Sequence, residues 1–505
     1  MGGIDLANVP IDRDYLMPSG AAGVSAEKAS AILSQFSRKR RAAAIAVPTA
    51  DAHVRTRLRQ LGEPITLFGE GPGDRRDRLR ELLTLQAEAA EAEDGEGDIQ
   101  MGDARTGGDE EEGDDQEEFY TTGTAELLQA RKEIARYSLP RAQTRIAFQK
   151  VEATIQRRAH VRHRKGIKER LQGFDLYGSQ IAADRPVGIA RFSPNGELIA
   201  AGNWAGGIKL LDVPNLDEKV AYRGHADRVT GIAWAPGATL PDSTVSTSSV
   251  NFASGGGGGN VQLWSLDQNT PVSTLSGHSE RVCRVEFHPS GHYLASASED
   301  TTWRLWDVNT STELLMQEGH AREVYTVSFN TDGSLLASAG LDSIGRIWDL
   351  RTGRMVMLLD SHIKPIYALD WSVDGYRILS GSGDGFAKCW DLRAMREMTS
   401  IGANTGGVTD LRWFKGTDGP ASGQLLQRDE KGEVQPKKAG SFFVSCGFDK
   451  NVKIFSADDW ALCKTLSGHV GNVLSTDVTS DGKWICSSGH DRTVKLWARD
   501  DQEGV

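Results

Sequence analysis

The sequence predicts an all-β propeller of seven four-stranded blades over residues 173–499, preceded by a partly disordered N-terminal region with short helices. Three observations support this fold class. All 12 tryptophans of the 505-residue chain lie between Trp204 and Trp497. Short alternating apolar runs separated by polar turns fill the same region, as in antiparallel sheets. Tryptophan followed by a small or acidic residue also recurs at intervals of 42 residues, at Trp264, Trp306, Trp348 and Trp390.

Two further series of residues keep the same 42-residue step, which identifies an internal repeat. The dipeptides at Gly277-His278, Gly319-His320 and Ser361-His362 form one series, and Asp300, Asp342 and Asp384 form the other. The repeat continues at Phe455 and Trp497, in step with Asp449 and Asp491, and Leu211 is a degenerate first member. These positions define seven repeats.

Residues 277–308 illustrate a single repeat, "GHSERVCRVEFHPSGHYLASASEDTTWRLWDV". Three short apolar runs are separated by turns at 288–292 and at Glu299-Asp300, and a fourth strand leads to the next repeat. This pattern resembles the WD-repeat family, and the resemblance covers about residues 174–499. It implies a ring of seven blades.

Two intervals exceed the 42-residue period. There are 53 residues between Leu211 and Trp264, and 65 between Trp390 and Phe455. We assign the additional residues to loops at 236–259 and 414–440, each between the first and second strands of a blade. The run of five glycines at 255–259 predicts a flexible turn. Both insertions are predicted to be mobile surface loops, for which partner binding and mere tolerance of an insertion are equally compatible explanations.

The ring also requires a closing strand. The last repeat ends at its third strand, near Trp497, and a closed ring leaves no sheet edge unpaired. The missing outer strand is therefore expected from the segment before the first repeat, near 174–181.

Histidine, serine, aspartate and tryptophan recur together in several repeats. A hydrolase needs one such set with an exposed nucleophile and an oxyanion hole, whereas a set repeated from blade to blade indicates a structural network of buried hydrogen bonds. The WD-repeat family uses its sets in this structural way. Asn404 replaces one histidine, and repeats one and two lack full sets, so these blades are expected to be less well tied. The full sets are His320, Ser338, Asp342 and Trp348; His362, Ser380, Asp384 and Trp390; and His469, Ser487, Asp491 and Trp497.

The composition argues against several classes of function. Eleven histidines and five cysteines do not pair at zinc-ligand spacing, and "GEGPGDRR" lacks the Lys-Ser/Thr of a phosphate loop. The sequence therefore predicts no metal, no cofactor and no enzymatic activity. It has no apolar run of about 18 residues, so no membrane association is expected. A net charge of -11 excludes one global basic field but permits local basic patches.

Residues 1–50 are rich in alanine and serine and are predicted to be disordered. Within them, "RKRR" at 38–41 fits a nuclear import signal and a solvated charge run equally well.

Residues 51–90 predict two short amphipathic helices joined by an extended link, because Gly62 stops the first helix and Pro64 forces extension. Two such helices are not expected to bury their own apolar faces, so a partner surface is expected to cover them. The candidate partner-binding residues are Leu58, Leu61, Pro64, Ile65, Leu67, Phe68, Leu79 and Leu82.

An acidic linker at 91–120 separates this motif from a basic helical segment at 121–172. Thr124 is expected to cap one helix, and a basic helix is expected beyond Pro140. Residues 131–170 hold 13 Lys and Arg against three acids, which favours contact with a phosphate backbone. A solvated helix between domains is the alternative. The candidate RNA-binding residues are Arg157, Arg158, Arg162, Arg164 and Lys165.

The segment "VRTRLRQLGEPITLFGEGPGDRRDRLRELL" at 54–83 narrows the resemblance. It is similar to the splicing-factor motif of the WD-repeat subunit of the spliceosomal U4/U6 small nuclear ribonucleoprotein (snRNP), the pre-mRNA-processing factor four family. The order of motif, acidic spacer, basic segment "SLPRAQTRI" and seven repeats is also the same. The likeness spans about residues 51–90 and 137–499, and residues 500–505 form a short tail.

This resemblance implies a nuclear, non-enzymatic scaffold of the U4/U6 di-snRNP and the U4/U6.U5 tri-snRNP. The partners that it implies are U4/U6 snRNA, a processing-factor-three-type protein, other tri-snRNP proteins and, as in animals, a spliceosomal cyclophilin bound through 51–83. The alternative is a general WD-repeat adaptor or ubiquitin-ligase substrate receptor that reads a peptide. That alternative leaves the motif at 54–83 unexplained.

Overall fold

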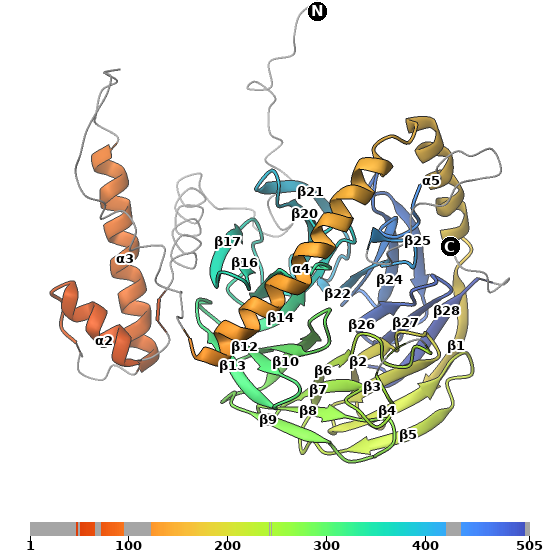
Figure 1. The fold of residues 1–505 in the computed structure, drawn as a ribbon, viewed down its shortest axis with the longest axis horizontal. Coiled ribbons are helices and arrows are strands. Elements are labelled where there is room, and N and C mark those ends of the chain that lie inside the picture. The colour runs from red at the N-terminus through yellow and green to blue at the C-terminus, as the bar shows by residue number, and fades with distance from the viewer. Residues whose placement is uncertain are drawn as a thin grey trace, which may run out of the picture.

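The computed structural model describes residues 47–48, 51–65, 72–94, 123–241, 243, 245–420 and 436–499. Within these segments, seven four-stranded antiparallel sheets form a ring, which confirms the predicted propeller (Figure 1). The first strands of neighbouring sheets contact one another around the centre.

The first four blades each use four consecutive strands. Blade one contains β2 (Val187–Phe192), β3 (Leu198–Asn203), β4 (Gly207–Asp212) and β5 (Glu218–Arg223). Blade two contains β6 (Val229–Trp234), β7 (Phe252–Gly256), β8 (Asn260–Trp264) and β9 (Ser273–Ser276). Blade three contains β10 (Val282–Phe287), β11 (Tyr293–Ser298), β12 (Trp303–Asp307) and β13 (Thr312–Gln317). Blade four contains β14 (Val324–Phe329), β15 (Leu335–Gly340), β16 (Gly345–Asp349) and β17 (Arg354–Leu359).

Blades five and six follow the same plan, and blade seven takes its fourth strand from the start of the ring. Blade five contains β18 (Ile366–Trp371), β19 (Arg377–Ser382), β20 (Phe386–Asp391) and β21 (Arg396–Gly402). Blade six contains β22 (Val408–Trp413), β23 (Phe442–Gly447), β24 (Asn451–Ser456) and β25 (Leu462–Ser467). Blade seven contains β26 (Val473–Val478), β27 (Trp484–Gly489), β28 (Thr493–Ala498) and β1 (Asp175–Ile181).

Strand β1 closes the ring where the sequence placed the closing strand. It pairs antiparallel with β28, from Asp175 opposite Ala498 to Ile181 opposite Thr493. Phe174, just before β1, is fully buried in a cluster that includes Trp497. Closure therefore combines backbone pairing with an apolar anchor.

The core lies between neighbouring sheets. Ala337, Ala339 and Ile347 of blade four, for example, pack against Ile366 and Trp371 of blade five. Small residues on one sheet and large ones on the next allow the sheets to approach closely at native packing density. The alternating apolar runs of each repeat supply this packing.

The first insertion differs from the expected mobile loop. Between β6 and β7, Asn251 is buried, and its Nδ2 donates to the carbonyls of Ser246, Thr247 and Ser249 at 3.1, 2.9 and 2.8 Å. Ala238 of the same insertion is fully buried. The segment is thus a packed extension of blade two, because one amide side chain holds its backbone.

The glycine run at 255–259 is also not simply a flexible turn. Gly255 and Gly256 belong to β7 and are buried. A Cβ atom at Gly256 would lie 2.2 Å from His225 Nδ1, and one at Gly255 would lie 2.6 Å from Val282 Cγ1. Close packing against blade three and against His225 therefore requires glycine at both positions.

The second insertion lies partly outside the described residues, since 421–435 are not among them. Its base is fixed on both sides. Phe414 stacks on Phe442 with ring centroids 4.6 Å apart. Asp418 accepts hydrogen bonds from the backbone N–H groups of Lys438 and Ala439 at 2.6 and 2.8 Å.

Helices α2 (Asp51–Gln60) and α3 (Pro72–Asp94) pack against each other, contrary to the expectation that they could not bury their own apolar faces without a partner surface. Val54, Leu58 and Leu79 are buried, together with Val47. The pair succeeds because α3 is long and because residues from three segments share one small apolar cluster.

Helices α4 (Ala125–Glu152) and α5 (Arg157–Leu171) precede β1, and α4 crosses one face of the ring (Figure 1). Thr124 caps α4, with its side chain accepting from Leu127 N at 3.3 Å. Pro140 was expected to separate two helices, but it lies inside α4, which continues to Glu152. Pro140 is exposed on the helix surface, and the break falls instead at 153–156.

Candidate functional site

The predicted histidine, serine and aspartate sets form buried chains of hydrogen bonds. In blade four, His320 Nδ1 lies 2.8 Å from Asp342 Oδ2, and His320 Nε2 lies 2.7 Å from Ser338 Oγ. The indole N–H of Trp348 donates to the same Oγ at 2.8 Å. Blades five and seven repeat this chain with His362, Asp384, Ser380 and Trp390, and with His469, Asp491, Ser487 and Trp497.

These serines are unsuited to act as nucleophiles. Ser338, Ser380 and Ser487 have no exposed surface, and each Oγ already accepts from an indole. Each chain of hydrogen bonds instead connects the loop before a blade to the second and third strands of that blade. This arrangement supports the structural interpretation of the sets.

A fourth complete set lies in blade three, where His278 contacts Asp300 and Ser296, each at 2.7 Å. Burial alone would raise the pKa of Asp300, but the hydrogen bond from His278 outweighs it and lowers the pKa to about 2. Sequence reasoning missed this set although His278 and Asp300 both belong to the 42-residue series. It did not recognise Ser296, which lies 42 residues before Ser338, as the serine of the set.

Blade six retains most of its chain despite lacking the histidine. Asn404 Nδ2 donates to Asp449 Oδ1 at 2.8 Å, and Asn404 Oδ1 accepts from Ser445 Oγ at 3.0 Å. The expectation that this blade would be poorly tied is therefore wrong for these two links, since an amide can donate and accept at once. The indole link is absent from this blade, because Phe455 stands where the other sets have tryptophan.

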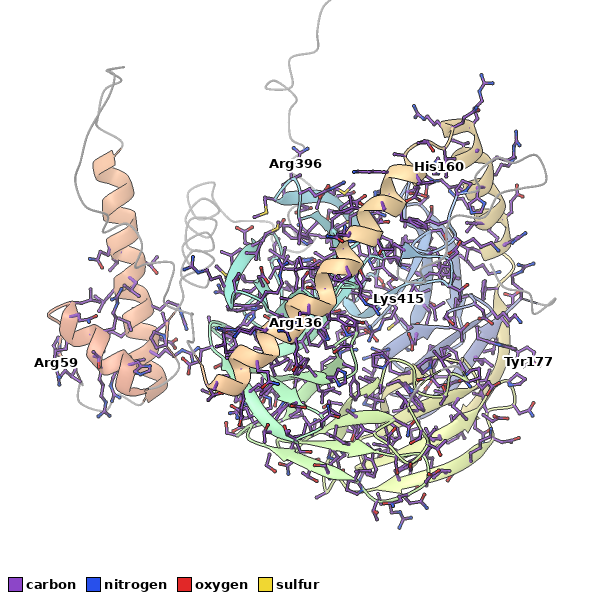
Figure 2. The ribbon with its side chains drawn as sticks, viewed as in Figure 1. Arg59, Arg136, His160, Tyr177, Arg396 and Lys415 are labelled. Atoms are coloured by element: carbon purple, nitrogen blue, oxygen red, sulfur yellow. The ribbon has the colours of Figure 1, made fainter. Side chains whose placement is uncertain are left out.

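Helix α4 is fixed to the turns between the first and second strands of blades three, four and five. Leu127, Ala130 and Ile134 belong to the apolar cluster of blades three and four. The polar contacts are Tyr137 Oη to Pro289 O at 2.7 Å, Tyr293 Oη to Glu133 at 2.7 Å, Arg145 Nε to Asp332 at 2.8 Å and Gln149 Nε2 to Asp374 O at 2.9 Å. This helix is a fixed part of the propeller face (Figure 2).

Helix α5 has an inward and an outward face. Inward, Ile167 and Leu171 are buried beside Phe414 and Phe442 of blade six. At the rim of this contact, Arg164 Nε pairs with Asp458 at 2.6 Å and Lys168 Nζ pairs with Asp459 at 2.9 Å. The helix is therefore held by one apolar and two ionic contacts.

The structure places the five candidate RNA-binding residues on the exposed surface of α5. Arg157, Arg158 and Arg162 form no ion pair with any carboxylate of the described residues, whereas Lys165 lies 3.9 Å from Glu169 on the same helix. Arg164 differs, because its pair with Asp458 turns it toward the propeller. Four of the five thus present a basic surface to solvent.

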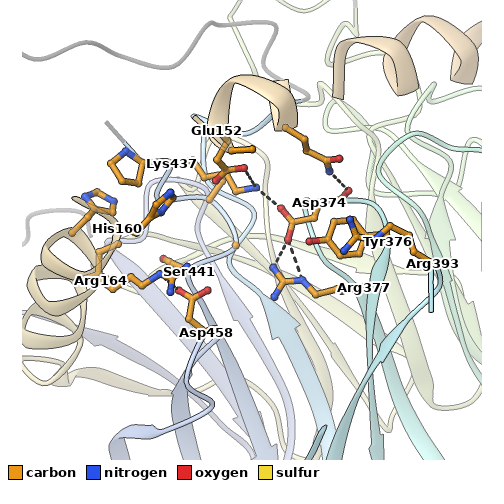
Figure 3. Close-up of a pocket in the computed structure, with 17 residues that line it drawn as sticks. Glu152, His160, Arg164, Asp374, Tyr376, Arg377, Arg393, Lys437, Ser441 and Asp458 are labelled. Carbon is orange, nitrogen blue, oxygen red and sulfur yellow. Dashed lines mark hydrogen bonds and ion pairs between the residues drawn. The ribbon is translucent and has the colours of Figure 1, made fainter. Parts of the chain in front are cut away.

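A pocket of about 380 Å³ lies between the α4–α5 connection and blades five and six (Figure 3). Glu152, His160 and Arg164 line it from the helices. Burial would raise the pKa of Asp374 on the opposite wall, but the charges of Arg377 and Lys437 outweigh burial and hold it well below its usual value. The walls come from segments far apart in sequence, so sequence analysis did not anticipate the pocket.

The candidate partner-binding residues at 58–82 fall into three groups. Leu58 and Leu79 are fully buried between α2 and α3, so they are not available to a partner in this arrangement. Leu61, Ile65 and Leu82 are half-buried, and Pro64 is exposed. Leu67 and Phe68 lie outside the described residues, as do the basic run at 38–41, the acidic stretch at 95–120 and the tail at 500–505.

Helix α3 contacts the propeller through two arginines. Arg76 Nη2 donates to the carbonyls of His320 and Ala321 at 3.1 and 2.9 Å, and Arg80 Nη2 donates to Ala321 O at 3.5 Å. Burial lowers the pKa of Arg76. The helix pair is thereby joined to the loop before blade four.

The described segments hold neither a cluster of metal ligands nor a helix suited to cross a membrane. No group of three or more His, Cys, Asp or Glu side chains there is arranged to hold a metal ion. Among the helices of the same segments, none combines the length and apolarity that a bilayer crossing requires.

Two family models match the chain. The model described as "pre-mRNA processing factor 4 (PRP4) like" matches residues 54–82, which span α2 and the first half of α3. The model described as "WD domain, G-beta repeat" matches 217–265, 269–307, 311–349, 353–391 and 460–498. The matches therefore cover both the helix pair and five of the repeats.

Similar proteins are known in several organisms. An uncharacterized WD repeat-containing protein of Schizosaccharomyces pombe is 40% identical over 53% of this chain and 55% of its own length. The U4/U6 small nuclear ribonucleoprotein Prp4 of Bos taurus is 38% identical over 45% of this chain and 42% of its own. In these two comparisons the chain spans about half of the relative's length.

The match to the U4/U6 small nuclear ribonucleoprotein PRP4 of Saccharomyces cerevisiae is longer. It is 37% identical over 98% of this chain and 99% of the yeast protein. Because this similarity includes the helix pair, the basic helices and all seven blades, the chain belongs to the PRP4 family of WD-repeat proteins.

Proposed function

We propose that this chain is a nuclear, non-enzymatic scaffold of the U4/U6 di-snRNP and the U4/U6.U5 tri-snRNP in pre-mRNA splicing. The similarity to the yeast U4/U6 protein along almost the whole of both chains carries the proposal. A general WD-repeat adaptor or substrate receptor would not account for the match at 54–82.

Two surfaces would carry the scaffold role. The outward face of α5 would contact U4/U6 snRNA, because Arg157, Arg158 and Arg162 form no ion pair with described carboxylates. Arginines of this kind suit the phosphate backbone of RNA. The link after α2, with exposed Pro64 and half-buried Ile65, would bind a partner protein, of which a spliceosomal cyclophilin is one candidate. A processing-factor-three-type protein and other tri-snRNP proteins would bind elsewhere on the chain.

Immunoprecipitation of the full chain tests the proposal. We expect U4, U6 and U5 RNAs to be recovered together, and their absence from a clean precipitate would contradict the scaffold role. A second chain without residues 51–90 serves as the comparison. It should retain the RNAs but lose the partner that binds the helix pair. Recovery of a peptide-bearing substrate without any RNA would instead favour the adaptor function.

The RNA contact of α5 is tested separately by binding of U4/U6 duplex RNA over a range of salt concentrations. The variant R157Q/R158Q/R162Q should weaken binding and reduce the salt dependence of affinity, because fewer counterions are released. The matched control R223Q/R322Q/R396Q removes the same charge from exposed arginines of the propeller. Equal losses in both variants would show that only net charge matters.

A further inference from the structure

The pocket beside α5 contains two buried polar atoms that have no hydrogen-bond partner among the described residues. These atoms are His163 Nε2 and Ser441 Oγ, and both residues line the pocket. Buried polar atoms are almost always satisfied in native proteins, so these two atoms in one pocket require water or a ligand to complete them. The volume of about 380 Å³ also exceeds the ~30 Å³ that one water occupies in the liquid.

Cations outnumber carboxylates among the side chains that line the pocket. Arg164, Arg377, Arg393 and Lys437 face the carboxylates of Glu152, Asp374 and Asp458, and Arg393 also lies 3.4 Å from Asp391 just outside the lining. Each carboxylate is also already paired. Asp374 contacts Arg377 and Lys437, Glu152 contacts Lys437 at 3.2 Å, and Asp458 contacts Arg164 at 2.6 Å.

Donors remain available for a ligand. Arg164 approaches Asp458 most closely through Nε, at 2.6 Å, and no hydrogen bond joins its terminal nitrogens to the described residues. A serine hydroxyl and an imidazole N–H can both donate to an oxyanion, and guanidinium groups match the geometry of phosphate oxygens. The set combines charge with directional donors, as a phosphate site requires.

We propose that this pocket binds a phosphate group of RNA, held by His163, Ser441 and Arg164. The inference rests on the proposed RNA contact of α5, and the helix geometry supports RNA as the source. His160, His163, Arg164 and Ile167 line the pocket from one side of α5. Arg157, Arg158 and Arg162 lie exposed on the same helix. An RNA strand that contacts these exposed arginines can therefore place one of its phosphates in the pocket.

The test uses the full chain, U4/U6 duplex RNA and fluorescence anisotropy. S441A and H163A should each weaken RNA binding several-fold, and the double variant H163A/S441A about tenfold. The matched control is S265A, which removes another buried serine Oγ without a partner, but in blade two and away from the pocket. S265A should leave the affinity unchanged. A loss in S265A equal to that in S441A would overturn the proposal.

Replacing chloride by inorganic phosphate at constant ionic strength gives a second readout. Phosphate should compete with RNA for the intact chain and much less for H163A/S441A, and equal competition would contradict the pocket assignment. If R157Q/R158Q/R162Q loses affinity while H163A/S441A retains it, the pocket proposal is wrong and the RNA contact of α5 stands. If neither variant loses affinity, both proposals are wrong.

Discussion

Arg145 in the middle of α4 forms an ion pair with Asp332 of blade four, with Nε 2.8 Å from Oδ2. Its Nη1 also donates to the backbone carbonyl of Asp374 in blade five at 3.2 Å. One side chain thus joins the helix to two adjacent blades. Both partners are largely buried, with 17% of the arginine and 6% of the aspartate side chain exposed.

We expect R145M to lower the free energy of unfolding by about 2–3 kcal/mol, because it leaves a buried carboxylate without its partner. The measurement is chemical denaturation, combined with limited proteolysis to detect release of α4. R136M on the exposed side of the same helix is the matched control and should have little effect. Equal stability of the two variants would show that the pair does not hold α4.

The hydrogen-bond chain of blade five predicts that the identity of the replacement for His362 matters. H362A should cost about 3 kcal/mol, because it removes one hydrogen-bond partner from the buried Ser380 and one from the half-buried Asp384. H362N should cost only about 1 kcal/mol, since Asn404 makes both links at the equivalent position of blade six. Thermal unfolding of the two variants checks this order. The reverse order would mean that blade six is a special case.

Two histidines, the half-buried His225 and the fully buried His288, predict a dependence of stability on pH. Burial lowers the pKa of His225 and of His288 to about 4, against an ordinary value of 6.5. Between these values the unfolded chain binds protons that the folded chain does not, so stability falls as pH decreases from 6.5 towards 4. Each histidine contributes at most about 1.4 kcal/mol per pH unit.

The variant H225N tests this contribution, because it removes one titrating group. Denaturation at pH 7 and pH 5 should show a smaller loss of stability on acidification than in the unaltered chain. H53N, which changes an exposed histidine of α2, serves as the control. The same pH dependence in all three proteins would exclude His225 as a source.

The glycine run of blade two predicts a large effect for a substitution at Gly256 and a small effect for one at Gly258. G256A should destabilise the chain by about 2–3 kcal/mol, since the new Cβ would meet His225 Nδ1 at 2.2 Å. G258A should change stability by less than about 0.5 kcal/mol, because nothing lies within 4 Å of its Cβ. Thermal unfolding of both variants measures the two changes in stability. Equal effects would contradict the role of close packing in β7.

The repeat made the ring and its closure predictable, because a fixed step in sequence reports a fixed structural unit. The repeat did not show how side chains pack within each blade. Glycines in β7 looked like a turn, since a sequence does not show that Val282 and His225 approach them. The insertion of blade two looked mobile because its order depends on hydrogen bonds from a single side chain, that of Asn251. The repeat pattern does not reveal those bonds.

Contacts between distant segments were likewise not predictable. The apolar residues of α2 and α3 were expected to need a partner, but Leu58 and Leu79 cover each other. The pocket beside α5 combines residues near 160, 375 and 440, which only the closed ring brings together. Periodicity describes one element at a time, and these features depend on several.

The pairing of β1 with β28 also determines the order in which the protein can be completed. On the ribosome, β1 is made before any blade, and its partner is made last, so blade seven cannot form until synthesis has passed Ala498. Until then β1 is a strand without a neighbour, of the kind that pairs with other chains. Because α5 leads directly into β1, the basic helix can pack on blade six while the strand that follows it still waits for β28.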